Sequence, residues 1–292
     1  KMGKRKVLFR AAALALAAVM TFSWGPSKFV KADSVDSDQY LALGADLSSK
    51  EKQTVLELLG VSNTSDYTLI TVTNKEEHDY LGDYLSSKVI GSRALSSVTV
   101  KKTDGGSGVN VTTENITYCT EGMYKNALVT AGIKDAEVKV AGPFKISGTA
   151  ALVGVMKSYE QMTGKKIPEK SKDAATDELI TTGEVSESIG KEDAEKLIAD
   201  VKQKVAEDNL KTPAEIGEAI DESAKDLEIN LSDADRQKIQ ELMDKISDLN
   251  LNVDQLKEQA KDIYNKLNDS GFFEKVKSWF SGFVDTIKGI FS

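Results

Sequence analysis

Residues 95–117 read Leu-Ser-Ser-Val-Thr-Val-Lys-Lys-Thr-Asp-Gly-Gly-Ser-Gly-Val-Asn-Val-Thr-Thr-Glu-Asn-Ile-Thr. Apolar and polar side chains alternate on both sides of the central segment 104–108, which contains three glycines. Alternation with a period of two is typical of β-strands with one buried face, and glycine readily adopts the positive φ of tight turns. The stretch therefore predicts strands at 95–101 and 109–117, joined as a hairpin.

The sequence on either side of this hairpin predicts one strand and one helix before it, and one helix and one strand after it. The order is β-α-β-β-α-β, which is that of a ferredoxin-like domain. We therefore expect the fold class α+β, with a ferredoxin-like domain over residues 33–164 and flanking helices. The remaining elements are strands at 67–73 and 136–141 and helices at 47–59, 75–90, 122–131 and 147–162.

The C-terminal half has a different composition. Its apolar residues recur at three-four spacing with Lys, Glu and Asp between them, a pattern that indicates amphipathic helices. The basic, proline-containing stretch 165–172 predicts a linker, and residues 173–270 predict an acidic helical domain. Residues 271–292 predict a separate aromatic, amphipathic helix. Within 173–270 we expect helices at 173–182, 191–207, 213–227, 232–249 and 253–267.

The first 32 residues have the pattern of a secretory signal peptide. A basic start that includes Arg5 and Arg10 precedes an apolar run from Ala11 to Trp24, and the small residue Ala32 marks a cleavage point. The apolar run is shorter than the roughly 20 residues that span a bilayer. We therefore expect a secreted or extracytoplasmic protein of the cell envelope.

The chain as a whole is acidic. The chain has 38 Lys and Arg against 46 Asp and Glu, a net charge of −8. Segment 1–32 contains seven of the basic residues and no acidic one, so its removal leaves 31 against 46, or −15. Residues 33–164 account for −5 and residues 165–292 for −10. A chain with this net negative charge lacks the basic surface that neutralises phosphate groups, so we do not expect nucleic acid as a partner.

Several long runs, at 40–48, 126–133, 147–152, 157–160 and 259–264, resemble a family of secreted proteins of Gram-positive bacteria that is catalogued as a domain of unknown function. The likeness covers most of the chain after residue 32. The resemblance implies an exported protein of the cell envelope. It assigns no activity and no catalytic residue.

Ser147, Gly148 and Thr149 lie between a predicted strand and a predicted helix. Backbone N–H groups at a helix start can hold an anion, and a hydroxyl can be a nucleophile, so this segment is a candidate anion site. A hydrolase would need His78, the only histidine, to reach Ser147. Ordinary helix capping by Ser147 or Thr149, and an exposed His78, are the simpler expectations. One histidine with one cysteine predicts no metal site, and we expect no cofactor.

Cys119 is the only cysteine, so it cannot form an internal disulfide. The simplest interpretation is a small buried apolar side chain. Two alternatives make the protein thiol-dependent, namely an intermolecular disulfide and a thioester with Gln161. We expect a non-enzymatic protein, with the thiol and the Ser147–His78 hydrolase as the alternatives.

Residues 271–292 carry the clearest functional pattern. Their apolar side chains recur at three-four spacing, which gives a helix one bulky aromatic face. Such a helix could lie in a membrane interface, bind a partner, self-associate or dock on the rest of the protein. The expected contact residues are Phe272, Phe273, Val276, Trp279, Phe280, Phe283 and Ile287.

Overall fold

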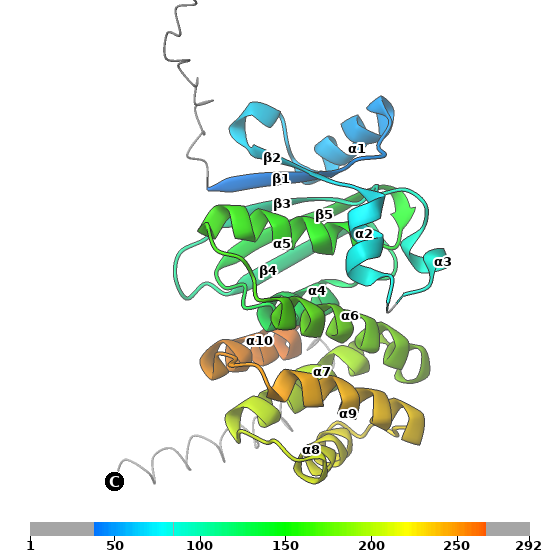
Figure 1. Cartoon of the computed structure of the whole chain (residues 1–292), viewed down its shortest axis with the longest axis vertical. Coiled ribbons are helices and arrows are strands. Elements are labelled where there is room, and N and C mark those ends of the chain that lie inside the picture. The colour runs from blue at the N-terminus through cyan, green and yellow to red at the C-terminus, as the bar shows by residue number, and fades with distance from the viewer. Residues whose placement is uncertain (1–37, 84, 267–292) are drawn as a thin grey trace, which may run out of the picture. The chain divides into compact units, whose positions relative to one another are not determined.

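The computed structural model describes residues 38–83 and 85–266, which lie in one compact unit. The predicted signal peptide and the predicted helix at 271–292 lie outside the described residues. The described part is α+β, with a five-stranded sheet and ten α-helices (Figure 1). The strands are β1 (Gln39–Gly44), β2 (Thr68–Val72), β3 (Ser97–Lys102), β4 (Val109–Ile116) and β5 (Ala136–Ile146).

The helices alternate with the strands in the first half of the chain and follow one another in the second half. A short 3-10 turn also lies at Thr64–Asp66. The helices are α1 (Ser49–Leu59), α2 (Asn74–Leu81), α3 (Ser87–Ile90), α4 (Glu121–Thr130), α5 (Thr149–Thr163), α6 (Glu169–Ile189), α7 (Lys191–Glu207), α8 (Pro213–Asp226), α9 (Asp233–Ser247) and α10 (Val253–Lys266).

The strand order is β2-β1-β3-β5-β4, so β5 lies between the two strands that we expected to pair. The predicted hairpin is therefore wrong, and so is the ferredoxin-like arrangement that depended on it. β5 runs antiparallel to β3 and parallel to β4, and Val138 is opposite both Val100 and Val111. The glycine-rich segment connects β3 and β4 past the start of β5, where Asp135 accepts hydrogen bonds from the backbone N–H groups of Gly106 and Gly108 at 2.8 and 3.0 Å.

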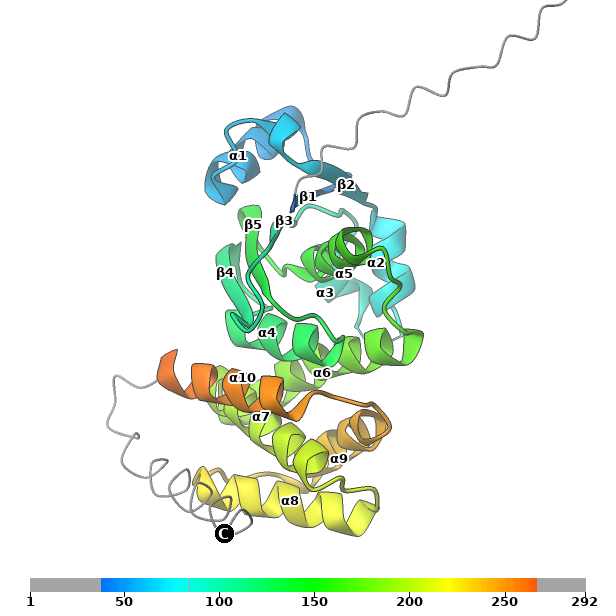
Figure 2. The same cartoon turned by 90° about the vertical axis from the view of Figure 1, so that its left-hand side faces the viewer.

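Strand β1 is a central strand that the sequence analysis did not predict. It pairs in parallel with β2 and antiparallel with β3. Leu41 and Leu43 belong to a small core under α1, whereas Ala42 packs in the main core under α5. Successive side chains of a strand point to opposite faces, so α1 and α5 cover opposite faces of the sheet (Figure 2).

Most predicted helices of the first half are present, with one difference. Ser48 and Glu51 form a reciprocal capping box at the start of α1, and Gly60 ends that helix at a φ of 73°. The helix expected at 75–90 is instead two, α2 and α3, because α2 ends with Gly82 as its C-cap. Glycine has low helix propensity, which explains why α2 ends at this position.

The helices of the second half match the predicted ones closely. Only α6 differs strongly, because it begins at Glu169 inside the predicted linker and extends to Ile189. Lys172 at its first turn is buried and forms an ion pair with Glu160 of α5 at 2.9 Å. Helix α6 packs against α4 below the sheet, and α7 and α10 lie beneath α6 (Figures 1 and 2). The division into two domains remains a prediction.

Candidate functional site

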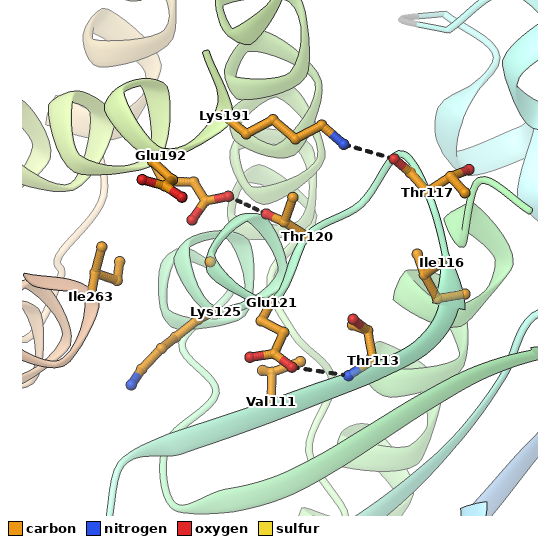
Figure 3. Close-up of a pocket in the computed structure, with 12 residues that line it drawn as sticks. Val111, Thr113, Ile116, Thr117, Thr120, Glu121, Lys125, Lys191, Glu192 and Ile263 are labelled. Atoms are coloured by element: carbon orange, nitrogen blue, oxygen red, sulfur yellow. Dashed lines mark hydrogen bonds between the residues drawn. The ribbon is translucent and has the colours of Figure 1, made fainter. Parts of the chain in front are cut away.

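A cavity of about 580 Å³ opens beside β4, at the place where the sheet meets the helices of the second half (Figure 3). Strand β4 and the start of α4 form one side, and the start of α7 and the end of α10 form the other. Three apolar side chains line it, Val111, Ile116 and Ile263, together with five charged ones. Larger cavities with an apolar lining and a few polar groups are the usual places for ligands.

Strand β4 is an edge of the sheet, and side chains of two helices bond to the backbone along β4 and just beyond its end. Glu121 of α4 accepts a hydrogen bond from the backbone N–H of Thr113 at 3.2 Å. Lys191 of α7 donates to the backbone carbonyl of Thr117, just after β4, at 2.7 Å (Figure 3). An edge strand otherwise presents unpaired backbone groups, which another chain can pair with. The side chain of Glu121 therefore stands where a further strand would bond, and Lys191 bonds to the backbone just beyond the end of β4.

The buried carboxyl group of Glu195 lies at the N-terminus of α4. It accepts a hydrogen bond from the hydroxyl of Thr120, which is also the N-cap of this helix. A Cβ atom on Gly122 would collide with the Glu195 carboxyl, so a larger residue here would force the Glu195 side chain to move. Burial raises the pKa of the Glu195 carboxyl.

A second cavity of about 360 Å³ continues along β4 toward its start. Its lining includes Val109 of β4, the turn before it, and residues of α10. Lys125 lines both cavities, and it forms an ion pair with Asp262 of α10 at 2.6 Å. The two cavities are neighbours that share Lys125, and we call them together the β4 groove.

The β4 groove has an acidic lining. The first cavity contributes Glu121, Glu192 and Glu195, and the second contributes Asp135, Asp254, Glu258 and Asp262. The basic side chains are Lys125, Lys134 and Lys191. Seven carboxyl groups thus face three lysines.

The predicted anion site at Ser147, Gly148 and Thr149 lies at the start of α5, where a carboxyl group of the protein itself is bound. The Thr149 hydroxyl donates to Glu77 of α2 at 2.5 Å, and it lies 3.2 Å from the Ser147 hydroxyl. Glu77 is buried, and this burial raises the pKa of its carboxyl. The Ser96 hydroxyl accepts from the N–H of Ala151 in the first turn. The N-cap of α5 is Gly148, with no side-chain cap hydrogen bond, so the expected capping by Ser147 or Thr149 is wrong.

The proposed catalytic pair has other hydrogen-bond partners. Nε2 of His78 lies 3.1 Å from the carbonyl oxygen of Gly91, whereas the Ser147 hydroxyl lies beside Thr149. Glu77 and His78 are adjacent in α2, yet it is Glu77 that reaches the start of α5. The hydrogen bonds of the described residues therefore do not join His78 to Ser147.

Cys119 has the character of a buried apolar residue. It is 1% exposed, and burial raises the pKa of its thiol to about 12. The thiol is therefore protonated at neutral pH, and the thiolate is the reactive form. Its backbone N–H bonds to Ser147, beside the start of α5, while Gln161 lies twelve residues beyond Thr149 in that helix. At 1.5 Å per residue this is roughly 18 Å, far beyond the length of a thioester bond.

The residues of the β4 groove were missed as a site by sequence reasoning. They come from strand β4 and three helices that are far apart in the chain. One signal was present, because the expected strand 109–117 carries no charge on its buried face and is followed within eight residues by Glu121 and Lys125. The contact residues predicted at 271–292 lie outside the described residues. Residues 38–83 and 85–266 contain no group of three or more potential metal ligands and no helix suited to crossing a membrane.

Comparison with known proteins places the chain among relatives. The model of the family described as "Protein of unknown function (DUF1002)" matches residues 43–263. The "Uncharacterized protein YpuA" of Bacillus subtilis (strain 168) is 41% identical over 268 residues, which cover 89% of this chain and 92% of that protein. No solved structure matches the chain significantly. The family match runs from the end of β1 into α10 and includes the residues of the β4 groove, so the chain belongs to the DUF1002 family of proteins of unknown function.

Proposed function

We propose that this protein is an exported, non-enzymatic interaction protein that binds an extended segment of another polypeptide beside β4. The observation that carries the proposal is the open edge of β4, where Glu121 and Lys191 hold backbone groups next to the cavity. Extended peptides commonly bind proteins by adding a strand to such an edge. Main-chain hydrogen bonds then supply affinity.

Replacing the hydrogen bond between Glu121 and β4 by bonds to a bound peptide costs little free energy. An intramolecular hydrogen bond contributes about 1 kcal/mol net, so an incoming strand can replace the Glu121 bond at small cost. Val111 and Thr113 lie on the side of β4 that faces the cavity, which leaves room for alternate side chains of the added strand. At the other edge of the sheet, Lys157 bonds the carbonyl of Thr71 in β2 at 2.6 Å, which makes β2 a matched comparison.

Two substitutions at β4 should change peptide binding in opposite directions. Thr113→Pro removes the outward N–H to which an added strand would bond, so it should abolish binding. The fold should be retained, because proline is tolerated on an edge strand where its nitrogen faces outward. Glu121→Ala removes the competing acceptor and should strengthen binding. The probes are capped octapeptides in which valine alternates with lysine, serine or glutamate, and amide NMR shifts of β4 residues report the contact.

Thr71→Pro is the matched control, since it makes the same change at the β2 edge and should leave binding intact. Circular dichroism checks that each variant is folded. The proposal is wrong if no probe shifts the β4 amides at millimolar concentration, or if Thr113→Pro binds as well as the unchanged protein.

A second contact is proposed for residues 271–292, namely with a membrane surface. The exposed large apolar side chains of the described residues are Leu58, Leu69 and Phe144, all in the first half. From the start of α6 to Ile263, the side chains that the structure describes include no exposed large apolar one to cover a bulky aromatic face. The segment has three Lys against two acidic residues, so attraction to anionic lipid adds little to hydrophobic contact.

The tryptophan of this segment provides the test. Cleavage after Ala32 would remove Trp24, so exported protein should begin at Asp33 and carry Trp279 as its sole tryptophan. Vesicles of phosphatidylcholine and phosphatidylglycerol should shift its emission to the blue. Phe280→Glu should abolish the shift, whereas Ser281→Glu, with the same charge off the apolar face, should retain it. Emission that is already blue in buffer and indifferent to vesicles would contradict the membrane contact. A concentration-dependent shift without vesicles would indicate self-association instead.

A further inference from the structure

We propose that the β4 groove selects basic segments, in which Lys or Arg occupies alternate positions of the strand that adds to β4. This inference rests on the proposed function and names the chemistry of the partner. Its basis is the charge of the helical wall of the groove, where the carboxyl groups of Glu192, Asp254 and Glu258 are exposed.

Two of the three lysines are already engaged. Lys125 is buried and pairs with Asp262, and Lys191 donates to the carbonyl of Thr117. In contrast, Glu192, Asp254 and Glu258 have exposed side chains on the helical wall of the groove. The wall that faces an incoming strand is therefore predominantly anionic.

The alternation follows from strand geometry. Side chains of an added strand point alternately to the two faces of the sheet, in step with those of β4. Val111 and Thr113 belong to the face on the groove side, whereas Thr112 and Glu114 are exposed on the other face. Every second side chain of the partner thus enters the groove beside the acidic wall. The long apolar stems of Lys and Arg also suit the apolar lining, because they can cover it while the charged ends reach the carboxylates.

The expected size of the effect is moderate. Exposed ion pairs are individually weak, so two or three new pairs strengthen binding about tenfold. The preference should weaken as salt is added, since the carboxylates of the wall are exposed. Main-chain bonding to β4 does not depend on salt in this way.

The test compares the three capped octapeptides on the full mature protein. The lysine peptide should bind about tenfold more tightly than the serine peptide, and the glutamate peptide should bind most weakly. The double variant Glu192→Lys and Glu258→Lys should reverse the order of the lysine and glutamate peptides. The matched control, Glu218→Lys with Glu241→Lys, changes net charge equally on α8 and α9 and should keep the original order.

The outcomes separate this inference from the proposed function. Equal binding of all three peptides at β4, or reversal by the control pair as well, overturns the basic preference while strand addition stands. Failure of every peptide to shift the β4 amides overturns both.

Discussion

Replacing Lys202 by methionine is expected to lower the free energy of unfolding by about 3–5 kcal/mol. Lys202 of α7 and Glu178 of α6 are both 0% exposed, and their charged atoms lie 2.7 Å apart. Removal of one partner of a buried ion pair leaves the other charge without compensation in a medium that solvates it poorly. Urea unfolding followed by circular dichroism measures the change, and an unchanged m-value would show that the loss is one of stability.

The surroundings of this pair make the expected loss large. Besides Glu178, the Lys202 ammonium donates to the carbonyl of Asn126 at 3.0 Å and to the hydroxyl of Thr130 at 3.2 Å, so all three of its protons are used. The Thr130 hydroxyl in turn donates to the second oxygen of Glu178. Burial lowers the pKa of Lys202, as it disfavours the charged form. The network joins α4, which covers the sheet, to α6 and α7.

A matched exposed pair and a double variant serve as controls. Lys75 and Asp79 form an ion pair at 2.5 Å with side chains 82% and 56% exposed, and Lys75→Met should change stability by less than about 1 kcal/mol. Lys202→Met combined with Glu178→Leu should recover most of the loss, because a pair of apolar residues replaces a buried ion pair at little cost. Equal effects of Lys75→Met and Lys202→Met would contradict the argument.

The local elements were predictable because their signals are local. Ser48 with Glu51 and Thr212 with Glu215 form capping boxes at the predicted helix starts, and Gly60 ends α1 directly after the predicted range 47–59. Helix α7 matches its predicted range residue for residue. Such signals act over three or four residues and do not depend on the rest of the fold.

The strand order was not predictable in the same way. A period of two identifies the buried face of a strand but not its neighbour. The glycine-rich turn favoured a hairpin, yet Asp135 holds that turn against the start of β5, which enters between β3 and β4. Strand β1 was missed because its run from Tyr40 to Gly44 is nearly all apolar. A central strand covered on both faces lacks the alternation that reveals a strand.

The β4 groove and the buried pair were hidden for a related reason. The groove forms only when α7 and α10 pack beside β4, and no spacing of residues in the sequence predicts that these elements pack together. Lys202 did carry a signal, because it lies four residues after Ile198 and three before Val205, both fully buried or nearly so. A lysine in register with an apolar helix face indicates a buried partner.

Gly148→Ala is the second change expected to have a large effect, lowering the free energy of unfolding by about 2–5 kcal/mol from two sources. Gly148 has a φ of 97°, a region that alanine adopts only with strain. A Cβ at this position would also lie 2.6 Å from a methyl group of Ile116 and 2.6 Å from the hydroxyl of Tyr124. That hydroxyl is buried and donates to the carbonyl of Gly148 at 2.5 Å, so it cannot move aside without losing its bond.

The opposite end of the same helix supplies the control. Gly164 follows α5 with a φ of 65°, and a Cβ there would have nothing within 4 Å. Gly164→Ala therefore carries the backbone strain alone, which is about 1–2 kcal/mol. The difference between the two variants isolates the crowding against Ile116 and Tyr124, which should be about 1–3 kcal/mol. Because Ile116 also lines the β4 groove, Gly148→Ala should shift the amide signals of Ile116 and Thr117, while Gly164→Ala leaves them in place. Equal losses of stability from the two variants would show that backbone strain, and not packing, requires glycine at the start of α5.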